Sequence, residues 1–135
     1  LDSYVLEIKN LNRLLLRKKL KIWYRRMKIY YNPKCSKCRI ALEKIGDVEK
    51  IEYLKTPPTK EELKKILNKL KMKAVEIVRK KEAAFDKFKG KDFSNEEWIK
   101  ILVENPILIQ RPIIVKGDKA VIGRTEEKLQ EIMKD

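Results

Sequence analysis

The pattern of hydrophobic and polar positions along residues 27–135 predicts a succession of short strands and helices. The run Lys28–Tyr31 is rich in strand-forming residues and predicts a short buried strand, which the Asn32-Pro33 pair ends. Helical spacing of apolar residues follows from about Cys35 to Ile45. The segment Ile51–Leu54 then predicts a second strand. The first half of this region therefore begins as a strand-helix-strand unit.

Two capping boxes mark longer helices in the middle of the chain. The Thr-x-x-Glu sequence at Thr59 predicts a helix that runs to Leu70. The Ser-x-x-Glu sequence at Ser94 predicts another helix, which Pro106 closes. Two shorter helical stretches are expected between them: Val75–Arg79 and Glu82–Phe88.

The last third of the chain predicts a hairpin followed by a helix. The region Ile107–Val115 is an apolar strand region that Pro112 interrupts, and Lys116–Lys119 is typical of a tight turn. The strand Ala120–Ile122 would pair back, and Thr125 is a good N-cap for a final helix. This order predicts an α/β or α+β layer around a small central sheet.

Residues 1–26 differ from the rest, because they carry eight basic and two acidic residues. Apolar residues recur there at the spacing of a basic amphipathic helix: Tyr4, Ile8, Leu11, Leu15 and Ile22. Three explanations stay open: a surface-seeking helix, a partner-binding arm, or non-native residues ahead of a domain that starts at Met27. We favour the third, since Met27 opens a clear strand. The expected organisation is an extension over 1–26 and one domain over 27–135.

Composition narrows the chemistry. The chain has no histidine, which excludes an imidazole base, a Cys/His pair and a His-ligated metal. No apolar run reaches the roughly 18 residues that would cross a membrane. Two cysteines three positions apart are not the disulfide framework of a secreted domain, so we expect a cytoplasmic protein with no metal. The net charge of +14 fits nucleic-acid binding, but abundant Lys and Glu together favour a solvated, ion-paired surface.

The sequence Cys35-Ser36-Lys37-Cys38 is the strongest local signal. It follows a strand and opens a helix, where unpaired N–H groups and the helix dipole stabilise a thiolate. Neighbouring Lys and Arg side chains add positive potential, and such sites lower a cysteine pKa. Cys35 is then the expected nucleophile, and Cys38 can attack its adduct. The alternative is a pair of small buried residues without reactivity.

Arginine usage gives a second signal. From Met27 onward the chain has 22 lysines but only four arginines: Arg39, Arg79, Arg111 and Arg124. A guanidinium binds an oxyanion bidentately, as lysine does not. Arg111 precedes a proline in an apolar region, and Arg124 precedes a helix N-cap, so both are candidates for anion binding. Ordinary salt bridges are the alternative. Pro112 either ends a strand or forms a cis peptide beside the reactive sulfur.

These motifs together resemble the glutaredoxin-linked arsenate reductase (ArsC type) and Spx family. The segments that carry the resemblance are Ile29–Cys35 with Arg39, Ile77–Glu82, Asn105–Ile113 and Ile122–Arg124. The resemblance implies a thioredoxin-like α/β fold with an inserted helical region and a small mixed central sheet flanked by helices. It also implies that Cys35 is the nucleophile, that Arg79, Arg111 and Arg124 hold the arsenate oxyanion, and that Pro112 is the cis proline.

Three positions separate the two branches of the family. The reductases often have His where this chain has Tyr31, and Cys38 matches the Spx pattern, whereas Arg124 matches the reductases. We weigh Arg124 most and expect a thiol-dependent arsenate reductase. An Spx-like, redox-switched regulator that binds RNA polymerase is one alternative, and a general thiol–disulfide oxidoreductase is the other.

For the reductase, the resemblance implies no bound cofactor. It implies an external thiol reductant instead, either glutathione with glutaredoxin or thioredoxin. We expect the protein to be a monomer.

Overall fold

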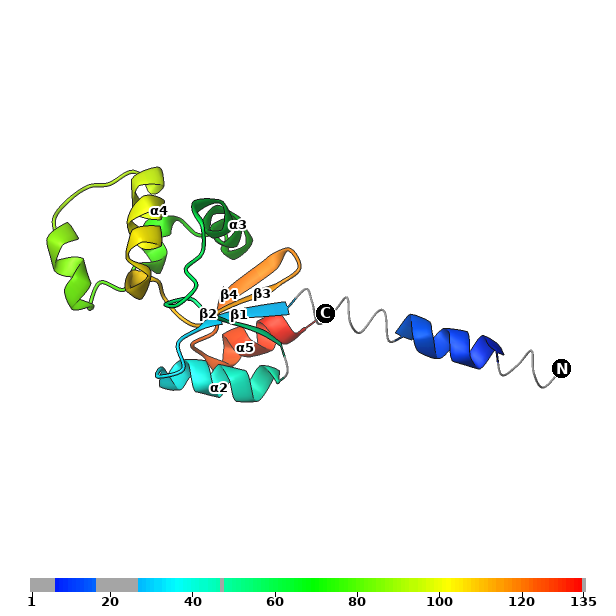
Figure 1. Ribbon diagram of the computed structural model, residues 1–135. Coiled ribbons are helices and arrows are strands. Elements are labelled where there is room, and N and C mark those ends of the chain that lie inside the picture. Colours follow the sequence, from blue (N-terminus) through cyan, green and yellow to red (C-terminus); the bar gives the residue numbers. More distant parts are fainter. Residues whose placement is uncertain (1–6, 17–26, 47, 135) are drawn as a thin grey trace.

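A four-stranded mixed sheet forms the centre of the computed structural model, which describes residues 7–16, 27–46 and 48–134 (Figure 1). Its strands are β1 (Met27–Tyr31), β2 (Glu49–Glu52), β3 (Ile113–Lys116) and β4 (Lys119–Ile122). They lie in the order β2-β1-β3-β4. The pair β1 and β2 is parallel, whereas β3 is antiparallel to both of its neighbours. The predicted small mixed sheet is therefore present.

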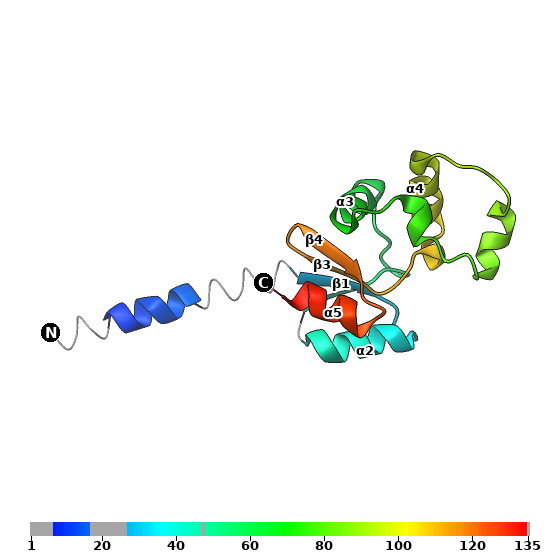
Figure 2. The ribbon, with the colours of Figure 1, turned by 180° about the vertical axis from the view of Figure 1, so that it is seen from behind.

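Helices cover both faces of this sheet (Figures 1 and 2). One face packs against α2 (Ser36–Ile45) and α5 (Glu126–Met133), and the other against α3 (Lys60–Leu70) and α4 (Asn95–Glu104). Alternation along β1 explains the two cores, because successive side chains of a strand point to opposite faces. Ile29 lies in the core of α2 and α5, and Tyr30 lies in the core of α3 and α4.

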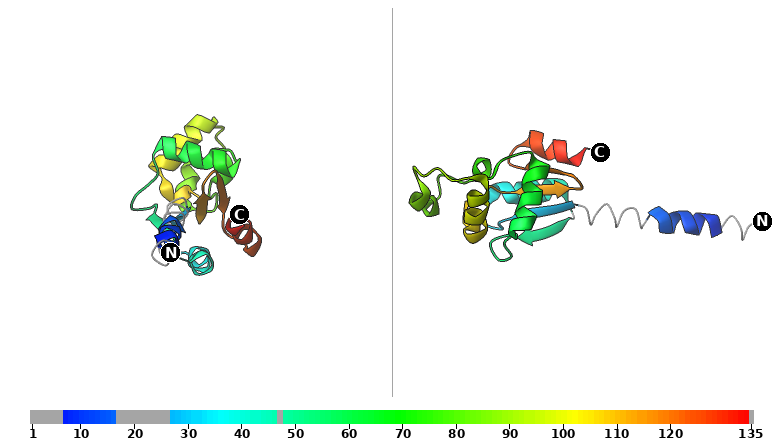
Figure 3. Two further views of the ribbon diagram at one scale, coloured as in Figure 1. Left: turned by 90° about the vertical axis from the view of Figure 1, so that its right-hand side faces the viewer. Right: turned by 90° about the horizontal axis from the view of Figure 1, so that it is seen from above.

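The segment between α3 and β3 is the inserted helical region that the sequence predicted. It contains α4 and three short 3₁₀ helices: η1 (Ala74–Ile77), η2 (Ala83–Phe88) and η3 (Pro106–Leu108). Trp98 of α4 packs against three phenylalanine rings, with centroids 5.1 to 6.3 Å away. Figure 3 shows this region extending beyond the end of the sheet. Aromatic and aliphatic packing holds it together, with one isolated antiparallel bridge between Val78 and Ile109.

The predicted helix starts are confirmed. Thr59, Ser94 and Thr125 are the N-caps of α3, α4 and α5, and each side-chain oxygen accepts a hydrogen bond from a backbone N–H three residues later. The Ser94 capping box has both of its hydrogen bonds. The two short helical stretches are also present, but as the 3₁₀ helices η1 and η2.

Two strand predictions were partly wrong. The second strand lies earlier than expected, because β2 ends at Glu52 and residues 53–55 form a turn. The apolar region Ile107–Val115 contributes only Ile113–Val115 to β3, which ends at Lys116. Its start is the helical turn η3, since Pro106 suits the first turn of a helix and Pro112 cannot donate to a strand ladder. Apolar character alone did not separate a buried turn from a buried strand.

A helix spans residues 7–16, within the segment where a basic amphipathic helix was predicted. All of its side chains are exposed, including those of Ile8, Leu11 and Leu15. Tyr4 and Ile22, which complete the predicted apolar face, lie outside the described residues. Within the described ranges, no helix is long and apolar enough to cross a membrane.

Candidate functional site

Cys35 lies between the end of β1 and the start of α2, as the sequence predicted. A tight turn places it there: the Cys35 N–H donates to the Asn32 carbonyl oxygen at 3.0 Å, and the Lys34 N–H donates to Asn32 Oδ1 at 3.0 Å. Cys35 is the N-cap of α2. Its sulfur therefore lies beside the unpaired N–H groups of the first helical turn, where negative charge is stabilised.

The environment of Cys35 makes its thiol acidic. Partial burial raises its pKa, but hydrogen bonds from the Arg111 guanidinium, the Cys38 backbone N–H and the Cys38 thiol more than offset this effect. The net result lowers the pKa of Cys35 from 9.0 to about 7. This lowered pKa favours the thiolate form near neutral pH, and Cys35 is 8% exposed.

Cys38 lies one turn along the same helix, and its environment has the opposite effect. Its side chain is fully buried, and burial is the largest cause that raises its pKa to about 12, with further contributions from the Cys35 sulfur. A backbone hydrogen bond at Asn32 only partly opposes these effects. Both cysteines are free thiols. The lowered pKa thus belongs to the thiol that keeps a small accessible surface, and the raised pKa to the thiol that is fully buried. This contrast is compatible with the prediction that Cys35 is the nucleophile and Cys38 the second thiol.

Arg111 is the arginine that the structure brings to the sulfur. It precedes β3, and its guanidinium is the main group that opposes the effect of burial on Cys35. Two of its nitrogen atoms, Nε and Nη1, are buried and have no hydrogen-bond partner. The peptide bond between Arg111 and Pro112 is cis, so the predicted cis proline is confirmed. This side chain is the first positive charge that an anion bound at Cys35 would meet.

The other two candidate arginines hold the segment that carries Arg111. Arg79 Nη1 donates to the Ile107 carbonyl oxygen at 3.1 Å, and Arg79 Nη2 lies 3.3 Å from Glu82 Oε2. Arg124 Nη1 donates to the carbonyl oxygen of Arg111 at 2.8 Å. No hydrogen bond joins either guanidinium to Cys35 in the described part of the chain. The three arginines thus converge on residues 107–111, but only Arg111 contacts the sulfur. The fourth arginine, Arg39, is exposed on α2.

Tyr53 is a residue of the site that the sequence reasoning missed. It follows β2, is 1% exposed, and has a buried hydroxyl that makes no hydrogen bond of regular geometry, although the Arg111 guanidinium lies within hydrogen-bonding reach. Burial raises its pKa, and the Arg111 guanidinium beside it opposes that rise. The alternation of apolar positions at Ile51 and Tyr53 indicated a buried side chain. Because a buried tyrosine usually has a hydrogen-bond partner for its hydroxyl, a buried Tyr53 could have been predicted from the sequence to lie beside a polar group.

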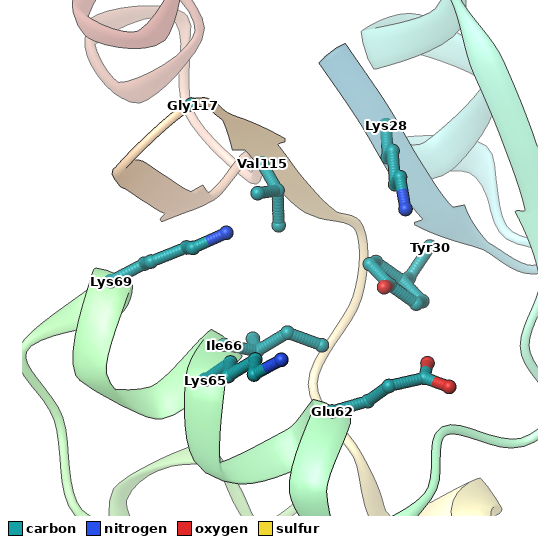
Figure 4. A pocket seen from close by; sticks show the side chains of 8 residues that line it. All are labelled: Lys28, Tyr30, Glu62, Lys65, Ile66, Lys69, Val115 and Gly117. Carbon is teal, nitrogen blue, oxygen red and sulfur yellow. The ribbon is translucent and has the colours of Figure 1, made fainter. Parts of the chain in front are cut away.

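A hollow that neither cysteine lines lies between β1 and α3 (Figure 4). We call it the lysine hollow; its lining residues are Lys28, Tyr30, Glu62, Lys65, Ile66, Lys69, Val115 and Gly117. Its volume is about 370 Å³. No cysteine or arginine lines it, so it offers positive charge without a nucleophile. It is therefore not the site that the cysteine motif predicted.

The donor set suits an anion rather than a metal. Over the residues that the structure describes, no group of three cysteine or acidic side chains is placed to hold a metal ion. Around Cys35 the neighbours are instead a guanidinium, backbone N–H groups and a phenol. All of these donate hydrogen bonds.

Comparison with known proteins gives one consistent result. The family model described as "ArsC family" matches residues 30–132. "Arsenate reductase" of Haemophilus influenzae is 38% identical over 112 residues, which cover 78% of this chain and 97% of that protein. "Arsenate reductase" of Neisseria meningitidis is 32% identical over 114 residues, with 79% and 97% covered. The structure "Arsenate reductase from Vibrio cholerae" aligns with a TM-score of 0.73 at 33% identity, covering 79% of this chain and 97% of that one.

Proposed function

The chain belongs to the ArsC family, and from this premise we propose that it reduces arsenate to arsenite with Cys35 as the nucleophile. Family membership confirms the predicted thioredoxin-like fold and the predicted class of enzyme, an oxidoreductase of the arsenate reductase type. The observation that carries the proposed mechanism is the Cys35 sulfur at the start of α2, beside Arg111, with a pKa of about 7. A thiolate is the reactive form in attack on an electrophile.

In the first step, the Cys35 thiolate attacks the arsenic atom of arsenate. A sulfur–arsenic bond forms, and one arsenate oxygen leaves as water after it takes up protons from solvent. Arsenic remains in the +5 state at this stage. Arg111 supports the step because its charge offsets that of the oxyanion and holds it against the sulfur.

In the second step, another thiol attacks the Cys35 sulfur. A disulfide bond forms, the sulfur–arsenic bond breaks, and its electron pair stays on arsenic, which is released as arsenite in the +3 state. The hydrogen bond from the Cys38 thiol to Cys35 supports this role for Cys38. Part of the high pKa of Cys38 comes from the Cys35 sulfur, and that part falls once arsenic occupies the sulfur. Thioredoxin would then reduce the Cys35–Cys38 disulfide, whereas glutathione with glutaredoxin would serve if the second thiol is external.

Arg79 and Arg124 are proposed as further ligands of the oxyanion. Each already donates to a main-chain oxygen, but a guanidinium has five N–H donors. Donors therefore remain for an anion. Their hydrogen bonds to the carbonyl oxygens of Ile107 and Arg111 support this role, because they bring both guanidinium groups to the segment that carries Arg111.

The experiment that tests this function is a donor-coupled assay with the purified protein. Arsenate-dependent oxidation of NADPH is expected with at least one of two systems, thioredoxin with its reductase or glutathione with glutaredoxin. Arsenite should appear in equal amount. Turnover with neither system, in protein whose Cys35 alkylates normally, would remove the proposal.

A general thiol–disulfide oxidoreductase is the second candidate. The observation that favours it is that Arg79 and Arg124 make their bonds to main-chain oxygens and, for Arg79, to Glu82. This candidate predicts that the wild type has no arsenate-dependent turnover, and that Arg79→Lys and Arg124→Lys reduce a protein disulfide as fast as the wild type does. The arsenate reductase predicts that both variants lose arsenate-dependent turnover while disulfide reduction is kept.

A further inference from the structure

Three buried side-chain polar atoms lack a hydrogen-bond partner among the described residues: Tyr53 Oη, Arg111 Nε and Arg111 Nη1. They belong to two side chains that lie against each other, with the Arg111 guanidinium within hydrogen-bonding reach of the Tyr53 oxygen. That contact uses the hydroxyl oxygen as an acceptor, so the phenol proton is still available to a ligand. A buried donor without a partner is unfavourable, and native proteins rarely leave one. Three such atoms in one place indicate a ligand position rather than a packing defect.

The topology explains why these groups meet. Tyr31 at the end of β1 pairs with Glu52 at the end of β2, so the residues that follow each strand share one edge of the sheet. Cys35 follows β1 through one short turn, and Tyr53 follows β2 directly. The antiparallel β3 begins at this same edge, which places Arg111 there as well. Ligands of open α/β sheets bind at the carboxyl ends of the strands.

The chemistry of the unpartnered atoms defines what they would bind. Two of them are N–H groups of a cation, and the third is a phenol that can donate its proton. A tetrahedral oxyanion offers several acceptor oxygens and a negative charge, so one molecule can accept from all three atoms. The neighbouring thiols of Cys35 and Cys38 add no positive charge and no strong donor.

We propose that the Tyr53 hydroxyl donates a hydrogen bond to the oxyanion that Arg111 holds, which makes Tyr53 a substrate-binding residue of this site. The inference rests on the proposed function. The tyrosine ring is locked in the core of α3 and α4, so its hydroxyl is held in place before the anion arrives. Such a preorganised donor needs little rearrangement when charge moves onto the oxyanion during the reaction.

The test compares Tyr53→Phe with a matched control, Tyr30→Phe. Tyr30 is also buried in the core of α3 and α4, but it lines the lysine hollow. Tyr53→Phe is expected to lower kcat/KM for arsenate about tenfold to hundredfold, the usual effect of losing one hydrogen bond to a charged group. It should also raise, by a similar factor, the arsenate concentration that protects Cys35 from iodoacetamide. The alkylation rate without arsenate and its pH dependence should stay unchanged, and Tyr30→Phe should behave as wild type.

Each outcome decides something different. If wild-type protein shows arsenate protection but no arsenate turnover, the proposed function fails, and the protection assay still tests Tyr53. If Tyr53→Phe is protected at the wild-type concentration and keeps its kcat/KM, the inference is wrong. If the Tyr53→Phe variant does not fold, a second measurement takes its place: the change in tyrosine absorption when arsenate is added to the wild-type protein. An absorption change that is also seen in Tyr30→Phe supports the inference. If the absorption does not change when arsenate is added, the inference is wrong.

Discussion

Two polar regions flank β1, and both contain a buried tyrosine. At the lysine hollow, Tyr30 lies among three lysines and Glu62 (Figure 4). At the cysteine site, Tyr53 lies beside one arginine and two thiols. The hollow has more positive charge, but its cations are on long, flexible stems and a carboxylate offsets part of their charge. The comparison teaches that fixed donors around a nucleophile, rather than the number of cations, make a reactive site.

The two tyrosines show the same contrast. Burial raises the pKa of both, but the charges that act on Tyr30 are the carboxylates Glu62 and Glu49, which raise it further. Arg111 opposes the rise at Tyr53. Two carboxylates thus act on the phenol of the lysine hollow, whereas a cation acts on the phenol of the cysteine site. The cation beside Tyr53 favours an anion next to that hydroxyl.

The largest effect is expected from Cys35→Ser. Serine keeps the N-cap position but has no thiolate, so arsenate-dependent turnover should fall to background, a loss of at least about a thousandfold. Donor-coupled NADPH oxidation measures it. Residual turnover within tenfold of wild type would mean that the nucleophile lies elsewhere.

Arg111→Lys should lower kcat/KM for arsenate by about a hundredfold, because lysine cannot present the same bidentate donors. It also removes the main group that lowers the Cys35 pKa. The midpoint of the pH dependence of iodoacetamide alkylation should then move upward, from about 7 towards 9.0. At pH 7 less thiolate is present, so alkylation slows. A midpoint that stays near 7 would show that the helix start alone sets the acidity.

Cys38→Ser separates the two routes of resolution. A serine hydroxyl still donates to the Cys35 sulfur, so the first step should persist. If Cys38 is the resolving thiol, turnover with thioredoxin should fall at least about tenfold, since no disulfide can form within the chain. Equal turnover with glutathione and glutaredoxin in the variant and the wild type would identify an external thiol instead. Single-turnover trapping of the Cys35 adduct provides the control for folding.

The smallest effect is expected at the lysine hollow. The double variant Lys28→Gln, Lys65→Gln should change kcat/KM for arsenate less than twofold at physiological salt and unfolding free energy by less than about 0.5 kcal/mol. Any decrease in the on-rate of the anion should be larger at low salt, because steering by surface charge weakens with ionic strength. A loss above tenfold at physiological salt would make the hollow part of the active centre and end the contrast drawn above.

Much of the fold could be predicted because its signals are local. The caps at Thr59, Ser94 and Thr125 depend on a side chain and a backbone N–H three residues away, so sequence spacing specifies them. The boundaries of β2 and β3 could not be read in this way. Strand ends are set by pairing with β1, which is a distant contact, and an apolar turn such as η3 has the same composition as a strand.

In the candidate site too, local features could be predicted from the sequence and features that depend on distant contacts could not. Cys35 was predictable because a strand, a turn and a helix start follow one another in the chain. The separation of the Cys35 and Cys38 pKa values, and the place of Tyr53, depend on which distant side chains bury or face them. The arginines were singled out by scarcity, which could not tell that Arg111 reaches the sulfur while Arg79 and Arg124 hold the backbone.

Arg79 and Arg124 grip carbonyl oxygens, which every amino acid possesses, so the identity of the side chains at the gripped positions has little influence on the attachment. An exchange of the Ile107 side chain, for example, leaves the acceptor of the Arg79 hydrogen bond in place. Exchange of Arg79 or Arg124 removes the donor itself, so each of these attachments depends on one side chain and not on the pair of residues that it joins.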